Sequence, residues 1–330
     1  MPQRDIIALA SSSGGLDVLR TVLGGLPADL PAAVLLVHHI GAYESILPQI
    51  LSRHTALQVR HGAQGEPVVP GSVYIAPPDH HMLVRNGRIE LSHGPKENFT
   101  RPAADPLFRA VAVEYGKRAV GVVLTGELDD GAAGLVAIRA CGGYAIVQEP
   151  LDAVAPSMPS SAMHATAVDA VAPAAELASA IVAALSASVL QGEPAMATRR
   201  QIEWETDMTR YGAAPIAQLD EMGKRSTLTC PECGGTLWSV AGKPARYRCH
   251  TGHGYTRMAL QEHQEEVLET ALWATIRRLH ERMATAQAAL AAANQAGDVG
   301  LALEQQRLVG RCEALEAELH RFVEQASGGD

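Results

Sequence analysis

Between residues 5 and 187, short apolar runs alternate with stretches in which apolar side chains recur every three or four positions. The short runs predict buried β-strands, and the recurring pattern predicts amphipathic helices. Regular alternation of the two indicates βαβ units. We therefore expect an α/β fold, a doubly wound and mostly parallel sheet with helices on both faces. The predicted strands are 6–10, 33–38, 73–76, 120–125 and 144–148, and the predicted helices are 15–25, 44–54, 104–116, 131–141 and 174–186.

The alternation changes between residues 58 and 93. Turn-forming residues occur at 69–72 and at 85–88, and the second turn joins apolar runs at 82–85 and 88–91. Two short apolar runs joined by an Asn-Gly turn predict a β-hairpin. We expect this stretch to be an antiparallel appendage or edge of the sheet.

The rest of the chain predicts three further parts after a first domain at 1–187. Residues 188–225 lack a regular pattern and predict a linker, residues 226–256 hold a Cys/His cluster, and residues 257–330 are helical. Narrow apolar seams on both sides of a break at 293–298 predict a helical hairpin or coiled coil. The hairpin would either pack within its own chain or form a homodimer contact. The seams are Leu272, Ile276, Leu279, Met283, Ala286 and Leu290, then Leu308, Cys312, Leu315, Leu319 and Phe322.

Composition excludes several classes of protein. Of the 330 residues, 47% are hydrophobic and 19% are charged, which is typical of a globular protein and not of a disordered one. The net charge of −9 argues against a broad nucleic-acid surface, although residues around 224–248 are locally basic. The chain contains no apolar run of about 18 residues and no signal-peptide pattern, so we expect a cytoplasmic protein without membrane insertion.

Reactive side chains follow three of the predicted strands. The first strand runs into Ser11-Ser12-Ser13-Gly14-Gly15, the second ends at His38-His39, and a later one leads to Asp129-Asp130-Gly131. The carboxyl ends of parallel strands share one edge of the sheet, so these groups can meet there. A serine nucleophile needs a base, and the base needs a carboxylate to orient it. The pattern favours a hydrolase.

Two other interpretations fit the same residues. A glycine-rich turn after a first strand can bind a nucleotide phosphate, but the chain lacks a G-x-G-x-x-G or G-K-[ST] motif at this turn, and the second strand ends in His38-His39 where a ribose-binding acid would stand. The serines and aspartates could also be structural caps of helices and turns.

Several ordered segments make the chain similar to the catalytic domain of chemotaxis protein-glutamate methylesterases, the CheB family. The resemblance covers about residues 5–187. It rests on Ala10–Gly15, His39, Val73–His81, Arg101–Phe108 and Leu124–Leu135.

The resemblance implies a nucleophile at Ser12, a base at His39 and an acid at Asp130, with Ser11 and Ser13 as alternative nucleophiles. The backbone N–H of Ser13 follows the nucleophile and opens a helix, so it is a candidate oxyanion donor.

Two further positions bear on substrate preference. Arg101 is a candidate for the substrate cleft, or else a solvated surface residue. Glu127 and Leu128 stand where receiver-bearing family members carry Met and Gly. A carboxylate there would oppose anionic substrates.

The activity implied is hydrolysis of glutamate γ-methyl esters on methyl-accepting chemoreceptors, with deamidation of receptor glutamines by the same route. No cofactor is expected for this catalysis. Only five residues precede the first predicted strand, so we expect a catalytic domain without the N-terminal receiver that many members carry.

The Cys/His cluster predicts structural zinc. Cys230 and Cys233 have the spacing of a zinc knuckle. Cys249 follows after fifteen intervening residues, and His253 after three more. His250 is the rival fourth ligand. The cluster and the helices after it could dock other chemosensory proteins. In an alternative hypothesis, the chain is a catalytically silent scaffold that acts through this part.

Overall fold

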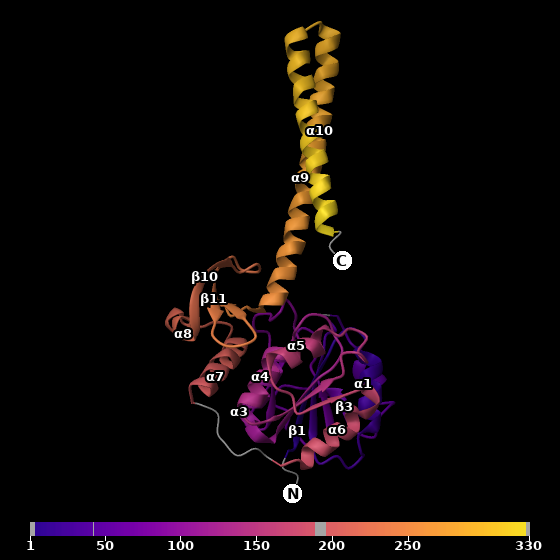
Figure 1. Cartoon of the computed structure of the whole chain (residues 1–330), viewed down its shortest axis with the longest axis vertical. Helices are drawn as coiled ribbons and strands as arrows, with labels where there is room; N and C mark the ends of the chain where they lie inside the picture. The colour runs from indigo at the N-terminus through magenta and orange to yellow at the C-terminus, as the bar shows by residue number, and fades with distance from the viewer. Residues whose placement is uncertain (1–3, 42, 189–195, 328–330) are drawn as a thin grey trace. The chain divides into compact units, whose positions relative to one another are not determined.

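The computed structural model describes residues 4–41, 43–188 and 196–327. The chain forms two compact units, Met1–Leu260 and Gln261–Asp330 (Figure 1). Among the described residues, no helix combines the length and the apolar character that a membrane span requires.

The first unit is built on a seven-stranded sheet whose neighbouring strands are all parallel, as predicted. The strand order is β3-β4-β2-β1-β7-β8-β9. The chain extends from β1 toward one edge and then returns to β7 on the other side of β1, so the order reverses between these two strands. The strands are β1 (Ile6–Ser11), β2 (Ala33–His38), β3 (Gln58–His61), β4 (Ser72–Ile75), β7 (Ala119–Val123), β8 (Tyr144–Gln148) and β9 (Ala170–Ala172).

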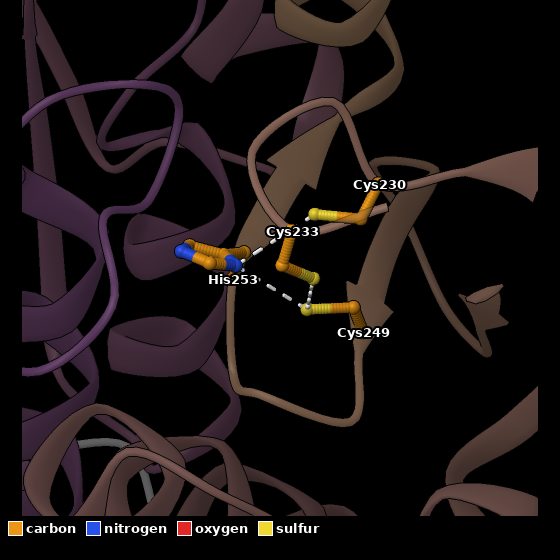
Figure 2. A group of neighbouring side chains, drawn as sticks. All are labelled: Cys230, Cys233, Cys249 and His253. Carbon is orange, nitrogen blue, oxygen red and sulfur yellow. Dashed lines mark hydrogen bonds between the residues drawn. The ribbon is translucent and has the colours of Figure 1, made fainter. Parts of the chain in front are cut away.

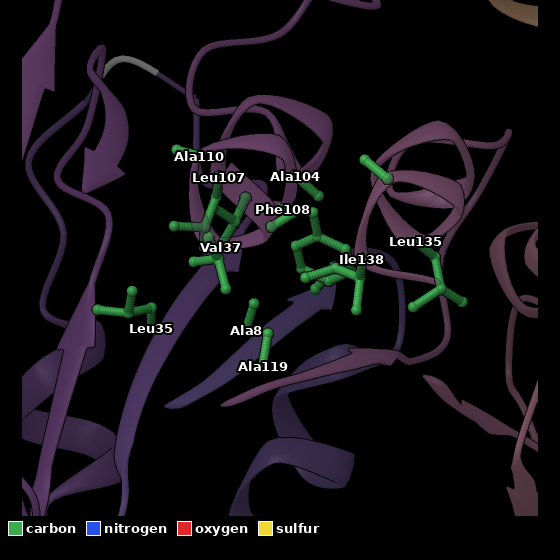
Figure 3. Packing of buried hydrophobic residues seen from close by; sticks show 14 of the residues in the cluster. Ala8, Leu35, Val37, Ala104, Leu107, Phe108, Ala110, Ala119, Leu135 and Ile138 are labelled. Carbon is green, nitrogen blue, oxygen red and sulfur yellow. The ribbon is translucent and has the colours of Figure 1, made fainter. Parts of the chain in front are cut away.

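Helices cover both faces of this sheet. Ala8 and Ala10 of β1 pack in one core with α3, α4 and α5, whereas Ile7 and Leu9 pack in a second core with α1, α2 and α6 (Figure 3 shows the first core). This division follows from the two-residue repeat of a strand. The helices are α1 (Gly15–Gly25), α2 (Leu47–Leu51), α3 (Ala104–Tyr115), α4 (Ala132–Ala140), α5 (Ser157–Ala165) and α6 (Ala174–Ser186).

The expected appendage is confirmed in part. Strands β5 (His81–Arg85) and β6 (Arg88–Ser92) form an antiparallel hairpin. Asn86 and Gly87 at its turn both have positive φ, which a tight two-residue hairpin turn requires. The other strands of this stretch, β3 and β4, belong to the parallel sheet instead.

The predicted linker over 188–225 is wrong for residues 196–222, which form α7 (Met196–Tyr211) and α8 (Ile216–Met222). Helix α7 packs on α3 and contributes buried residues to the first unit. Its inward face includes Glu205, Thr206 and Thr209, all fully buried. Ile202 and Met208 are buried on this side as well, but most residues of the helix are polar or charged, which explains why its few apolar positions did not mark it in the sequence.

The Cys/His unit is a four-stranded antiparallel sheet. Its strands are β10 (Gly223–Thr229), β11 (Thr236–Val240), β12 (Arg246–Cys249) and β13 (Gly254–Thr256), in that spatial order. The sheet begins at residue 223, three residues before the predicted boundary.

The C-terminal helices are α9 (Arg257–Ala296) and α10 (Val299–Ser327). They contact one another: the side chains of His280 and Glu316 approach to 2.6 Å, and Ile276 and Cys312 are buried. This confirms the predicted helical hairpin. Two predicted seam positions, Leu315 and Phe322, are 51% and 50% exposed, because the second half of the α10 seam runs through Leu319 and Val323 instead.

Candidate active site and candidate metal centre

The sheet brings the predicted nucleophile, base and acid to one edge. Strands β1 and β2 pair with Ser11 opposite His38, so the chain leaves the sheet at Ser12 and His39 side by side. The backbone N–H of Ser12 bonds to the carbonyl of Thr125, just after β7, at 2.9 Å. Asp130 lies in the connection from β7 to α4. All three residues therefore cluster where the strand order reverses, which is where open α/β sheets bind ligands.

Ser12 and His39 line the same open cleft, which has a volume of about 340 Å³. Ser12 is half-buried there, Ser13 is exposed, and Ser11 is fully buried under the sheet edge. Gly14, with φ of 72°, makes the left-handed turn that leads into α1. Of the three adjacent serines, Ser12 is the one that combines access to the cleft with proximity to the second strand end.

Ser11 forms a separate pair with His38. The Ser11 Oγ lies 2.9 Å from His38 Nδ1. Burial, together with neighbouring His39, lowers the pKa of His38 to about 4, so the ring is neutral at physiological pH. This pair joins the ends of β1 and β2.

His39 is oriented by Asp130. The His39 Nε2 lies 2.8 Å from Asp130 Oδ2, and Asp130 also accepts hydrogen bonds from the backbone N–H groups of Ala104 (2.6 Å) and Asp105 (3.1 Å) and from the Asn98 amide (3.3 Å). Burial alone would raise the pKa of Asp130, but the His39 contact and these N–H donors hold it below its ordinary value. An ionised Asp130 is an acceptor only, so His39 Nε2 carries the proton and Nδ1 carries the lone pair.

Among the described residues, no hydrogen bond joins Ser12 Oγ to His39. Contacts between a nucleophile and its base are often long before substrate binds. The Ser13 N–H has no acceptor in the described chain, so it is free to bind an oxyanion.

A second buried carboxyl, Asp105, supports the site and was missed from the sequence. Its Oδ1 accepts the N–H groups of Gly131 (3.0 Å) and Gly134 (2.6 Å), which ties the start of α3 to the loop that holds Asp130. Burial, and then the nearby charge of Asp130, raises the pKa of Asp105 to about 8. The pair therefore holds one negative charge, which resides on Asp130.

The other predicted substrate residues lie away from the cleft lining. Arg101 donates to Asp79 Oδ1 (2.7 and 3.0 Å) and to the carbonyls of His93 and Gly94, so its guanidinium braces the loops beside the hairpin. Glu127 is exposed to solvent.

A model of a known protein family matches the part of the chain that carries this site. A model of the CheB methylesterase family matches residues 7–181, more than half of the chain. This chain belongs to the CheB methylesterase family. The matched residues include Ser12, His39 and Asp130, whereas α7 and the Cys/His unit lie beyond the match.

Relatives from several bacteria match the same part of the chain. Protein-glutamate methylesterase/protein-glutamine glutaminase 1 of Xanthomonas campestris is 37% identical over 182 residues, which cover 54% of this chain and 51% of that protein. The protein of the same name from Geobacter metallireducens is 37% identical over 176 residues, 52% of this chain and 48% of that protein. The chain thus spans about half the length of these curated relatives.

The crystal structure of the Thermotoga maritima CheB methylesterase catalytic domain has the same fold. It superposes with a TM-score of 0.52 at 31% identity and covers 55% of this chain and 98% of that chain.

The Cys/His unit brings four side chains together outside the matched region. The ligand atoms of Cys230, Cys233, Cys249 and His253 all lie within 4.8 Å of one another (Figure 2). Cys233 and Cys249 Sγ are 3.6 Å apart, and His253 Nδ1 lies 3.5 Å from Cys249 Sγ. Sulfur ligands of tetrahedral zinc at about 2.3 Å are about 3.8 Å apart, so the group fits this metal. The same separation is far too long for a disulfide.

Two tight turns present these ligands. The N–H of Gly234 bonds to the carbonyl of Cys230 at 2.8 Å, and that of Gly252 bonds to the carbonyl of Cys249 at 3.0 Å. His253 Nε2 lies 3.2 Å from Glu232, which orients Nδ1 toward the cysteines. The exposed His250 is not part of the group. The geometry thus selects His253 over its rival.

Proposed function

We propose that this chain is a protein-glutamate methylesterase that hydrolyses γ-methyl esters of glutamate side chains on chemoreceptors. The observation that carries the proposal is that Ser12 and His39 line one open cleft while buried Asp130 accepts a hydrogen bond from His39. The names of the relatives support the reaction type, and the openness of the cleft suits a side chain carried on a receptor helix.

The first half-reaction forms an acyl-enzyme. His39 Nδ1 takes the proton of the Ser12 hydroxyl while Oγ attacks the ester carbonyl carbon. The Ser13 N–H donates to the developing oxyanion. The bond from carbon to the methoxy oxygen then breaks, and the proton on Nδ1 passes to that oxygen, so methanol leaves.

The second half-reaction restores the enzyme. Water gives a proton to His39 Nδ1 and attacks the acyl carbon, and the proton then returns to Ser12 Oγ as the glutamate carboxylic acid departs and ionises. Asp130 stays ionised and stabilises the His39 cation in both steps. A glutamine side chain would follow the same route with ammonia as the leaving group.

Methanol release from methylated receptor cytoplasmic fragments tests this proposal. We expect Ser12→Ala and His39→Ala to lower turnover by at least about 1,000-fold. Ser11→Ala is the matched control, because it removes a neighbouring hydroxyl that lies outside the cleft. It should keep near-normal turnover. Equal background release by the wild type and Ser12→Ala would reject the esterase and favour the scaffold hypothesis.

We also propose that Cys230, Cys233, Cys249 and His253 bind one structural Zn²⁺. All four ligand positions of a tetrahedral ion would come from the protein, which leaves none open for chemistry. Metal analysis of the purified chain should give one zinc per chain. Cys233→Ala should lose it, whereas Cys141→Ala, at a buried cysteine outside the cluster, should retain it. A wild-type chain free of zinc, or a Cys233→Ala chain that keeps it, would contradict the site.

The C-terminal helices are proposed to form a homodimer contact. Leu315 and Phe322 on α10 are half-exposed apolar side chains on a helix whose own seam is already filled by α9. The two side chains are seven residues apart and so lie on the same face of α10. A second copy of the hairpin is the partner that best suits this heptad spacing.

A further inference from the structure

The loop that carries Asn98 is bound along strand β13 of the Cys/His unit. The N–H of Asn98 bonds to the carbonyl of Gly254 at 2.8 Å, and Glu97 pairs with Gly254 in a parallel bridge. The ring of Phe99 packs on Tyr255 with centroids 4.7 Å apart. Residues 97–99 thus extend the sheet of the Cys/His unit by one short segment.

Strand β13 also decides which way the Asn98 amide points. The N–H of Thr256 can only donate, and it donates to Asn98 Oδ1 at 2.8 Å. Asn98 Nδ2 is therefore the end that faces Asp130, where it donates to Oδ1 at 3.3 Å. Asn98 and Phe99 both have positive φ, a conformation that costs free energy and persists only when surrounding contacts hold it.

The same strand holds the other neighbour of the catalytic acid. The Thr256 hydroxyl donates to Asp129 Oδ1 at 2.6 Å, and both groups are buried. One residue of β13 thus contacts Asn98 through its backbone and Asp129 through its side chain, with Asp130 between them.

The candidate metal centre adjoins this strand directly. His253 immediately precedes β13, and its carbonyl accepts the N–H of Cys249 at 3.1 Å. The hydroxyl of Tyr255 lies 3.3 Å from Cys230 Sγ. Without the ion, nothing would hold the three thiolates and the imidazole together. The turn from Cys249 to His253, which fixes the start of β13, would then lose its support.

We propose that the Cys/His unit is a metal-dependent support of the active site. Through β13 it positions Asn98 and Asp129 around Asp130, and full turnover requires the ion to be bound. Asn98 and Thr256 are positioning residues in this account, because they act on His39 only through Asp130. The kinetic test of this inference rests on the proposed function, and its dependence on metal rests on the proposed zinc site.

Asn98→Asp tests the positioning role within the full chain. Aspartate is isosteric, tolerates positive φ and keeps the oxygen that accepts from Thr256, but it replaces the donor facing Asp130 by a second carboxylate oxygen. We expect kcat to fall at least about tenfold with KM and zinc content unchanged. A role confined to stability would lower the melting temperature and leave kcat per folded molecule at the wild-type value.

Thr256 provides a matched pair of variants. Thr256→Val removes the hydroxyl that donates to Asp129 and also caps α9, whereas Thr256→Ser keeps both contacts. Thr256→Val should lower kcat, and Thr256→Ser should restore it. Equal kcat for the two variants would overturn the role of this hydroxyl.

Hydrogen exchange gives a readout that does not depend on the esterase. The full-length Cys233→Ala chain, with Cys141→Ala as control, should lose zinc and exchange faster at the N–H groups of Asn98 and Thr256, and at those of Ala104 and Asp105, which bond to Asp130. Wild-type exchange and wild-type kcat in zinc-free Cys233→Ala would overturn the proposal. If the wild type releases no methanol, the proposed function fails, but the exchange result still decides whether the metal centre supports Asp130.

Discussion

The ionisation of Asp130 is determined by the groups that surround its carboxylate. It is 3% exposed and accepts two backbone N–H groups, one amide and one imidazole. Those four donors keep its charge in place although burial opposes it. Asp105 is a neighbouring buried carboxyl that accepts two backbone N–H groups, from Gly131 and Gly134, and keeps its proton. Two aspartates of the same type therefore take different protonation states within one site.

Asp130→Asn should lower kcat by about 10⁴-fold. An amide at this position offers one acceptor oxygen in place of two, and its NH₂ group would face the donors of His39 and Ala104. His39 would lose the partner that fixes its tautomer and stabilises its cation. Stopped-time methanol assays at saturating substrate measure the change. Loss of less than tenfold would mean that another group orients His39.

The pKa of Asp105 predicts a pH dependence of stability. A carboxyl whose pKa is raised in the folded state contributes stability at low pH, and that contribution is lost as pH rises through about 8. Asp105→Asn keeps an acceptor oxygen and has no proton to lose. Relative to the wild type, its free energy of unfolding should therefore rise between pH 4 and pH 8. Denaturant titrations at several pH values check this, and a difference that is independent of pH would contradict it.

Topology alone predicted that the side chains after three strands would lie close together, and the family resemblance then pointed to one residue at each strand end. Ser12, His39 and Asp130 follow strands of a parallel sheet, and strand ends of such a sheet meet at one edge. No sequence pattern predicted the contact between Asn98 and Thr256. The two residues are 158 positions apart, and Asn98 lies in a turn, so no strand or helix periodicity indicates where its side chain lies. Only the folded chain brings them together.

Helix α7 joins a buried network of charged and polar side chains centred on Glu97. Glu97 accepts hydrogen bonds from Arg109 of α3 (2.5 Å), Arg248 of β12 (2.7 Å) and Thr209 of α7 (2.6 Å). The carboxylate is 3% exposed. Burial would raise the pKa of Glu97, but the two arginines hold it far below its usual range.

Glu97→Gln should destabilise the first unit by about 3 kcal/mol, because it leaves two buried guanidinium groups with too little negative charge. Glu203→Gln is the matched control on α7: its ion pair with Arg199 is about 40% exposed and should contribute less than about 1 kcal/mol. Urea unfolding of both variants measures the two losses. Similar losses would show that the buried network adds no more than a surface pair.

Elements with several apolar residues at regular spacing were predicted closely. Elements that are short or mostly polar were not. Strands β2 and β8 and helices α1 and α6 match their predicted bounds. Helix α7 was missed because few of its residues are apolar. Strands β3 and β9 were missed because three or four residues at a sheet edge give too little pattern.

The two compact units divide the proposed tasks of the molecule. Every residue of the candidate active site and metal centre lies within Met1–Leu260. The α9–α10 hairpin of the second unit carries the exposed apolar positions assigned to dimer contact.

Replacing Leu315 and Phe322 together by glutamate should convert a dimer into a monomer while esterase turnover stays unchanged. The charges would be buried at the contact between copies, which is costly, yet they lie outside the unit that holds the candidate active site. Light scattering coupled to size-exclusion chromatography measures the mass. A wild-type chain that already elutes as a monomer would reject the dimer.

The Ser11–His38 pair has a consequence for how the nucleophile is chosen. Serine occupies three consecutive positions and histidine two, so sliding β1 by one residue along β2 would again place a serine hydroxyl beside an imidazole. A one-residue slip, however, exchanges the faces of a strand. In β1 one face offers the methyl groups of Ala8 and Ala10 and the other the bulk of Ile7 and Leu9, and both are packed to zero exposure. Exchanging them would overfill one core and hollow the other. In the proposed mechanism, the volumes of aliphatic side chains up to five residues upstream thus decide which serine oxygen attacks. Repacking that strand is a route to moving the reaction from one serine to the next.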